Sequence, residues 1–114
     1  MRFPFRSFAA FTLLMSLVAA APVGAFADEY TVSMKGKAFS PAALRIQPGD
    51  TIRFVNDDSV THDIYSLTRG HLFTSGRRKP GKHAVFVFNR PGAFNVISAA
   101  QYDKMRLTVE VAER

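Results

Sequence analysis

Apolar and polar residues alternate along much of the chain after Ala27. Tyr30, Val32 and Met34 are separated by single polar residues, and a period of two recurs in later segments. This period is typical of a strand with one buried face. We therefore expect seven strands, over residues 30–34, 44–46, 52–55, 62–67, 83–88, 94–98 and 105–111.

Glycine and proline separate these segments. Pro48-Gly49-Asp50 and Arg90-Pro91-Gly92 read as short turns, whereas Gly70, Gly76, Pro80 and Gly81 mark one longer loop. Short strands at intervals of about ten residues predict an all-β antiparallel sandwich or barrel. No segment after Ala27 has helical periodicity, and the sequence contains no repeat or linker, so we expect one domain over residues 28–114.

The first 27 residues have the pattern of a cleavable signal peptide. Arg2 and Arg6 precede an apolar run, and Ala25-Phe26-Ala27 supplies the small residues that signal peptidase recognises. The apolar run is shorter than the roughly 20 residues that span a bilayer. We therefore expect export, removal of residues 1–27 and no membrane anchor.

Composition narrows the function of the remaining domain. Cleavage after Ala27 removes 27 of the 114 residues and leaves 87, which is too few for a two-domain enzyme, a doubly wound nucleotide-binding sheet or a barrel of eight βα units. The chain has no cysteine, so it has no disulfide, thiolate nucleophile, cysteine-type zinc site or iron–sulfur cluster. It also lacks a nucleophile elbow, paired carboxylates and a phosphate loop. We expect a protein that is not an enzyme.

Seven side chains could contribute to a metal site, but none has a strong ligand spacing. They are His62, His71, His83, Met34, Met105, Asp63 and Asp103. One interpretation pairs His62 with Met105 and a third ligand to hold Cu(I), which favours imidazole and thioether. The other makes Met34 and Met105 core residues and places His71 and His83 at the surface.

Basic residues gather between the fourth and fifth expected strands. The formal net charge of +6 falls to +4 once Arg2 and Arg6 are removed. Such a cluster can steer an acidic protein partner, or it can be a solvated loop. Nucleic acid is not an expected partner, because the protein is exported and shows no basic face with interleaved aromatic residues. The cluster comprises Arg69, His71, Arg77, Arg78, Lys79, Lys82 and His83.

The order of several short motifs resembles that of the cupredoxins, the small β-sandwiches of blue copper proteins. Phe39-Ser40-Pro41 leads into Pro48-Gly49-Asp50-Thr51-Ile52, and residues 54–64 are similar to the segment that delivers the first copper histidine. Phe86-Val87-Phe88 followed by Pro91-Gly92-Ala93-Phe94 is similar to the family's hairpin. The resemblance covers nearly all of the chain after Ala27 and implies a Greek-key β-sandwich of about seven strands.

The same resemblance aligns four positions with copper ligands, and two of them lack the ligand. His62 stands at the first histidine and Met105 at the axial methionine, but Ser98 replaces the cysteine and Gln101 replaces the second histidine. A blue copper site needs a thiolate in its trigonal plane, which a hydroxyl does not replace. We therefore expect no blue copper site.

Residues 56–67 and 105–111 are similar to small exported cupredoxin-like proteins of methylamine utilisation, the MauL family. This resemblance implies a periplasmic accessory protein of methylamine degradation. It would support biogenesis of the tryptophan tryptophylquinone (TTQ) cofactor of methylamine dehydrogenase and carry no cofactor itself. The partner would be that dehydrogenase or its maturation machinery. Apart from the resemblance, we expect the basic hairpin Arg77-Arg78-Lys79 to be the docking surface for an acidic partner.

Two alternatives remain open from the sequence. One is a copper-binding cupredoxin, either a copper chaperone or an electron carrier, with a rebuilt site at His62 and Met105. The other is a binding module that uses the sandwich only as a scaffold. Metal analysis separates the first alternative from the accessory protein.

Overall fold

Nine strands and one short 3-10 helix make up the fold in the computed structural model, which describes residues 27–101 and 105–113. The strands are β1 (Glu29–Lys35), β2 (Ala38–Ser40), β3 (Ala43–Ile46), β4 (Asp50–Asn56), β5 (His62–Ser66), β6 (Phe73–Arg78), β7 (His83–Phe88), β8 (Gly92–Ser98) and β9 (Arg106–Val111). The helix, η2 (Ala99–Gln101), follows β8 directly.

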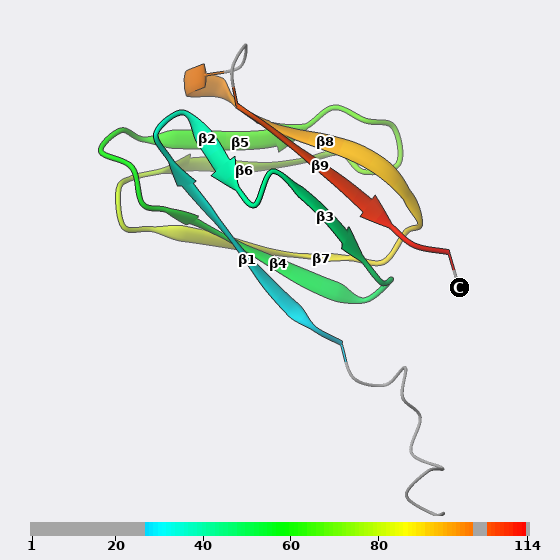
Figure 1. Ribbon diagram of the computed structural model, residues 1–114. Helices are drawn as coiled ribbons and strands as arrows, with labels where there is room; N and C mark the ends of the chain where they lie inside the picture. The colour runs from blue at the N-terminus through cyan, green and yellow to red at the C-terminus, as the bar shows by residue number, and fades with distance from the viewer. Residues whose placement is uncertain (1–26, 102–104, 114) are drawn as a thin grey trace, which may run out of the picture.

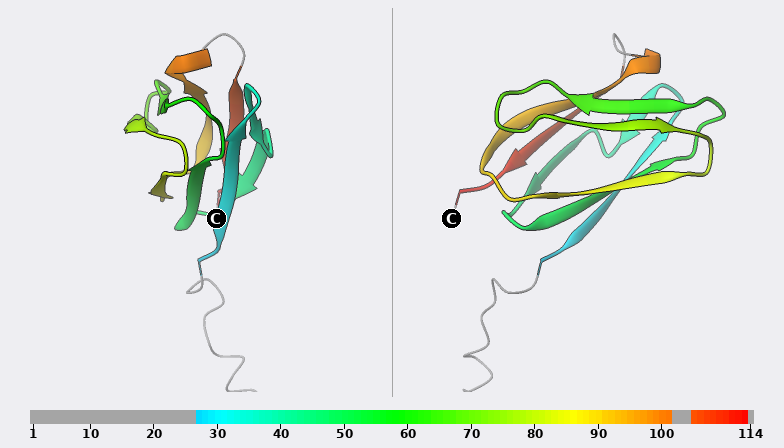
Figure 2. Two further views of the ribbon diagram at one scale, coloured as in Figure 1. Left: turned by 90° about the vertical axis from the view of Figure 1, so that its left-hand side faces the viewer. Right: turned by 180° about the vertical axis from the view of Figure 1, so that it is seen from behind.

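The strands form two sheets that face each other as two layers (Figures 1 and 2). One sheet has the order β2-β1-β4-β7 and the other the order β3-β9-β8-β5-β6. The predicted all-β sandwich is confirmed. Five of the seven strand pairings are antiparallel, whereas β1–β4 and β3–β9 are parallel. The parallel pairs arise because the chain crosses to the opposite sheet and returns before it lies beside the earlier strand.

All seven expected strands are present, and the structure adds β2 and β6. The residues of β6 read as loop because Phe73 is its only large apolar side chain and Gly76 interrupts the segment. In the structure Gly76 has a φ of 71°. Pairing with β5 holds this segment extended, with a bulge between Asp63 and Tyr65. The buried hydroxyl of Ser75 also accepts a hydrogen bond from the backbone amide of Ile64 at 3.0 Å.

The core lies between the two sheets and follows the period-two pattern. In β4 the alternate residues Ile52 and Phe54 are fully buried, and in β9 so are Leu107 and Val109. Burying one such side chain stabilises the fold by about 1.5–3 kcal/mol, so the core compensates for the missing disulfides. Its members are Val32, Met34, Phe39, Ile46, Ile52, Phe54, Ile64, Phe88, Phe94, Val96, Met105, Leu107, Val109 and Val111.

Aromatic rings close the side of the sandwich where β6 and β7 each end their sheet. Phe73 on β6 and Phe86 on β7 have ring centroids 4.6 Å apart, and Phe88 lies 5.1 Å from Phe94 on β8. Neither Phe73 nor Phe86 is fully buried. These contacts join the free edges of the two sheets without backbone pairing.

The expected signal peptide falls almost wholly on residues 1–26, which lie outside the described residues. Within the part of the chain that the structure describes, no helix has the length and apolar character needed to cross a bilayer.

Candidate functional site

Three strands bring the sequence-predicted site residues to one end of the sandwich. His62 begins β5, Ser98 ends the neighbouring β8, and Met105 directly precedes β9. The β4–β5 loop and the β6–β7 turn lie at the same end, on the left in Figure 1. We call this the His62 end.

His62 is fully buried, and both of its ring nitrogens are hydrogen-bonded. Nδ1 lies 2.6 Å from the hydroxyl of Ser98, and Nε2 lies 3.1 Å from a carboxylate oxygen of Asp58. The backbone amide of Ala100 donates to the same Ser98 oxygen at 3.3 Å. With the ring proton on Nε2, His62 donates a hydrogen bond to Asp58 and accepts one from the Ser98 hydroxyl. Each polar side-chain group of these three residues then has a partner. We call Asp58, His62 and Ser98 the buried triad; His62 and Ser98 are fully buried, and Asp58, whose side chain is 18% exposed, closes the triad towards solvent.

Asn56 organises the loop that carries Asp58. Its side-chain amide donates to the carbonyl groups of Val60 and Arg78, both at 2.8 Å, and its side-chain oxygen accepts the backbone amide of Asp58 at 2.9 Å. Asn56 is fully buried, so these bonds fix the loop against β6. The sequence analysis missed both Asn56 and Asp58 as site residues. The available signal was the Asn56-x-Asp58 pattern after a strand, which is typical of a side chain that caps its own turn.

Electrostatics at the triad favour the ionised form of Asp58. The hydrogen bond from His62 lowers the pKa of the Asp58 carboxyl, and the backbone amide of Ser59 lowers it further, while burial opposes both effects. The carboxylate is therefore the acceptor that completes the triad on the solvent side.

The geometry of the triad does not fit a copper ion between His62 and Ser98. Two nitrogen or oxygen ligands, each about 2.0–2.2 Å from one metal, lie more than about 3 Å apart in tetrahedral geometry. His62 Nδ1 and Ser98 Oγ are separated by only 2.6 Å and bond directly to each other. Ser98 also lacks the thiolate that the blue copper geometry requires.

The remaining candidate ligands are dispersed. Met105 and Met34 are buried members of the hydrophobic core, as one of the two sequence interpretations expected. Asp63 is on the outer face of β5, where it accepts the Thr74 hydroxyl at 3.1 Å. Across residues 27–101 and 105–113, no group of three or more His, Cys, Asp or Glu side chains could hold a metal ion. Asp103 lies outside the described residues, and so does the side chain of Gln101.

His71 takes part in packing rather than lying free at the surface. Its ring stacks on Phe94 with centroids 4.6 Å apart and an interplanar angle of 12°, and its Nε2 donates to the carbonyl of Arg90 at 2.8 Å. A Cβ at Gly92 would lie 2.9 Å from the His71 ring, so this stack requires glycine there. His83, by contrast, is exposed at the start of β7.

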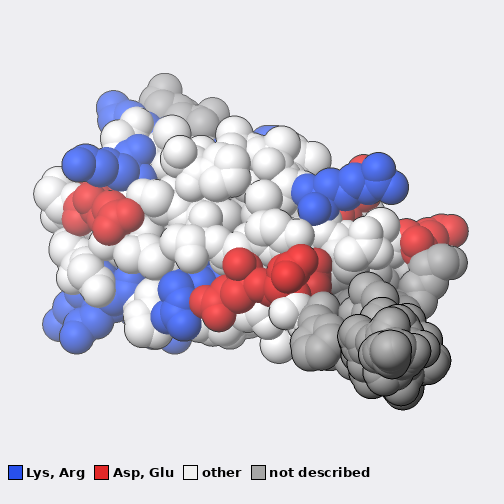
Figure 3. Space-filling view, turned by 60° about the horizontal axis from the view of Figure 1, so that its bottom comes forward, with Lys and Arg blue, Asp and Glu red and all other residues white. Residues whose placement is uncertain are grey.

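The structure divides the basic cluster seen in the sequence. Arg69 and His71 belong to the β5–β6 connection, at the opposite end of β5 from His62. The other five line one hollow of about 350 Å³ at the β6–β7 turn; they are Arg77, Arg78, Lys79, Lys82 and His83. We call this the basic hollow. At the left-hand end of Figure 3, Lys and Arg side chains lie around a smaller group of acidic ones.

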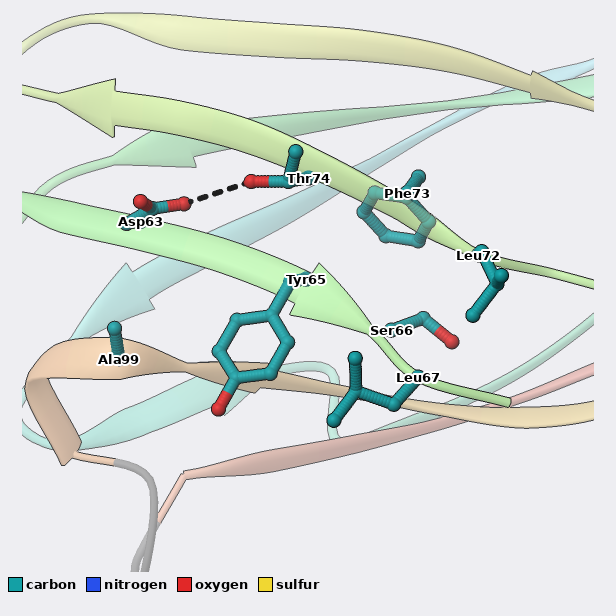
Figure 4. A pocket seen from close by; sticks show the side chains of 8 residues that line it. All are labelled: Asp63, Tyr65, Ser66, Leu67, Leu72, Phe73, Thr74 and Ala99. Atoms are coloured by element: carbon teal, nitrogen blue, oxygen red, sulfur yellow. Dashed lines mark hydrogen bonds between the residues drawn. The ribbon is translucent and has the colours of Figure 1, made fainter. Parts of the chain in front are cut away.

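A second hollow, of about 490 Å³, lies over β5 and β6 and is mainly apolar. Figure 4 shows Leu67 and Leu72 beside it, with Tyr65 and the hydrogen-bonded pair Asp63 and Thr74 along the strands. Leu67 is 74% exposed and Leu72 is 67% exposed, so both side chains are largely in solvent. This hollow is separate from the buried triad.

Solved structures identify the fold. The chain is similar to a purple cupredoxin from Nitrosopumilus maritimus, with 25% identity, a TM-score of 0.65 and coverage of 73% of this chain and 99% of that one. An oxidised amicyanin variant matches 82% of this chain and 87% of its own with a TM-score of 0.66, and its 17% identity supports the fold alone. The chain has a cupredoxin-like fold. The sequence matches no protein-family model and no curated protein.

A larger copper protein contains the same cupredoxin-like unit. The copper-containing nitrite reductase NirK from Thermus scotoductus SA-01 matches 75% of this chain with 26% identity and a TM-score of 0.69. The chain spans only 23% of that enzyme's length. The shared unit is therefore the β-sandwich. Two members of the buried triad, His62 and Ser98, stand at positions that the sequence resemblance aligns with copper ligands.

Proposed function

We propose that this protein is a periplasmic accessory protein of methylamine utilisation that supports TTQ biogenesis in methylamine dehydrogenase. In this role it binds and orients a protein partner and has neither catalytic activity nor a blue copper site of its own. Export through a signal peptide over residues 1–27 brings it to the compartment in which the partner matures.

The observation that carries the proposal is the buried triad. Both ring nitrogens of His62 are engaged by Asp58 and Ser98, at 3.1 Å and 2.6 Å. A cupredoxin-like domain whose copper histidine is held in this way has no evident group that carries an electron. Electron transfer to or from a dehydrogenase is therefore the less supported role, and a binding role uses the same rigid scaffold.

The pathway rests on the sequence resemblance over residues 56–67 and 105–111. These residues form the β4–β5 loop, β5 and β9; the loop and the starts of both strands lie at the His62 end. The segment that carries the resemblance is thus also the segment that holds Asp58 and His62. This coincidence supports a role for the His62 end in the proposed maturation step.

The docking residues of the proposal are Arg77, Arg78 and Lys79. Arg77 and Lys79 are exposed, and Arg78 pairs with His62 in the β5–β6 register. A basic surface attracts an acidic partner over about a Debye length, which raises the rate of encounter. Such electrostatic attraction is sufficient to bring the two proteins together in a transient maturation complex.

A deletion strain grown on methylamine tests the proposal. We expect loss of growth with little or no quinone-bearing dehydrogenase, measured by quinone staining of the purified subunit. Wild-type protein should restore both, whereas a variant with Arg77→Gln, Arg78→Gln and Lys79→Gln should restore the quinone only partway. Normal amounts of active dehydrogenase in the deletion strain would refute the maturation role.

A further inference from the structure

We propose that the basic hollow receives an acidic segment of a folded protein partner, with two or more carboxylates entering it together. This inference deepens the docking step of the proposed function and rests on it for the partner's biological identity. The binding chemistry itself rests only on the hollow and can be tested without the dehydrogenase.

The positive charges around the hollow lack acidic partners within the described chain. Among residues 27–101 and 105–113, the close contacts between basic and acidic side chains join Arg53 to Glu29 and His62 to Asp58, and neither contact involves the hollow. The Arg78 guanidinium donates only to the carbonyl of Arg77, at 3.3 Å, and its buried Nε has no acceptor. The cations are therefore available to an external anion.

The acidic side chains of the neighbouring loop are directed to other partners. Asp57 accepts the hydroxyl of Ser33 at 2.6 Å, and Asp58 accepts His62. Asp63, which lies opposite Arg77 in the β5–β6 register, accepts the hydroxyl of Thr74 at 3.1 Å. None of these three carboxylates lines the hollow or forms a salt bridge with its cations, so the lining itself is basic.

Backbone hydrogen bonds hold the β6–β7 turn in shape before any ligand arrives. The amide of Gly81 donates to the carbonyl of Asn56 at 2.8 Å, and the amide of Asn56 donates to the carbonyl of Lys82 at 2.9 Å. The amide of Lys82 also donates to the carbonyl of Lys79 at 3.0 Å. Because the turn is fixed to β4, a ligand need order only the side chains, which reduces the entropy lost on binding.

Size and energetics favour several carboxylates over a single small anion. One exposed ion pair contributes little to binding, so a lone phosphate or carboxylate gains little there. The hollow has a volume of about 350 Å³ and four permanently charged residues, Arg77, Arg78, Lys79 and Lys82. An acidic run on a protein can engage several of these charges at once, and the contributions then add within one encounter.

Binding of fluorescein-labelled hexaglutamate to the exported protein, followed by anisotropy, tests the inference. We expect saturable binding that weakens at least tenfold when NaCl is raised from about 20 mM to about 300 mM. Labelled hexaglutamine should not bind. The variant Arg77→Gln, Lys79→Gln, Lys82→Gln changes only exposed residues and should weaken binding at least tenfold with an unchanged unfolding midpoint.

A matched control removes the same number of charges elsewhere. Arg45, Arg69 and Arg106 are exposed and lie outside the hollow, so their joint change to Gln should alter the affinity less than twofold. Equal weakening in both variants would overturn the inference, because it would show attraction to net charge alone. Displacement of the peptide by an equal concentration of inorganic phosphate would also overturn it, in favour of a small-anion site. Neither result depends on whether the deletion strain lacks the quinone. The maturation role and the binding of an acidic segment can therefore each be refuted without the other.

Discussion

His62 and Ser98 stand where the cupredoxin resemblance places two ligands of one copper ion, and in this chain they bond to each other. Ser98 Oγ lies 2.6 Å from His62 Nδ1, and the other ring nitrogen, Nε2, is hydrogen-bonded to Asp58. A metal entering this position would have to break two hydrogen bonds in a site where His62 and Ser98 are fully buried. At the residue scale, we propose that the triad replaces a ligand set.

Changing Ser98 to Ala leaves the buried Nδ1 of His62 without a partner. We expect the free energy of unfolding to fall by about 1–3 kcal/mol, which is the cost of one unsatisfied buried polar group. Urea unfolding followed by circular dichroism measures the loss. Ser59→Ala alters an exposed hydroxyl of the neighbouring loop and should change stability by less than about 0.5 kcal/mol. Equal effects of the two substitutions would show that the Ser98–His62 bond contributes nothing.

Asp58 should make stability depend on pH under acidic conditions. Its pKa is lowered in the folded state, chiefly by the hydrogen bond from His62. The resulting stability is therefore fully present above the unfolded-state pKa of about 3.9 and is lost as the pH falls through the folded-state pKa. Urea unfolding between about pH 2 and pH 6 should show a smaller acid-dependent loss for Asp58→Asn than for the wild type. The control variant Asp57→Asn keeps the Asp58–His62 contact. Its free energy of unfolding should therefore still show the acid-dependent decrease that Asp58 causes.

At the scale of elements, the sequence pattern predicts those strands in which buried and exposed residues alternate. It does not predict a strand that is held extended only by hydrogen bonds to its neighbour. The segments of β4, β5 and β9 have alternating buried positions, so they were predictable. In β6, by contrast, Gly76 and the adjacent arginines read as loop, and only the pairing with β5 holds the segment extended. The Ser98–His62 bond could not be predicted, because it joins two strands that become neighbours only in the fold. The residues of the basic hollow were visible in the sequence as part of one basic cluster, and the structure adds which five of them line a common hollow.

The start of β1 is held by a buried carboxylate, which bears on the expected cleavage after Ala27. The backbone nitrogen of Asp28 donates to Asp50 Oδ1 at 2.9 Å, and Asp50 is 3% exposed. Cleavage would turn this amide into an ammonium group and strengthen the bond by adding charge. N-terminal sequencing of the exported protein should begin Asp28-Glu29-Tyr30. Met1 retained in a membrane fraction would contradict the prediction.

At the scale of the whole molecule, the two ends of β5 and β6 differ in character. The His62 end holds the buried triad and the basic hollow, whereas Leu67, Leu72 and the His71 stack lie towards the other end. The cupredoxin-like sandwich thus supplies a rigid frame that presents charge at the end where the resemblance aligns a metal site. The proposed binding of a protein partner would use this end as a charged surface rather than as a metal site.

Copper loading tests the central claim, that the triad replaces the metal site, most directly. Purified exported protein is incubated with excess Cu(I) or Cu(II), passed through a desalting column and measured for retained copper and visible absorption. We expect far less than one copper ion per chain and no intense thiolate band near about 600 nm, because the chain has no cysteine and His62 has no free nitrogen. One retained copper ion per chain, lost on His62→Ala, would contradict the claim and support the copper-binding alternative at His62 and Met105.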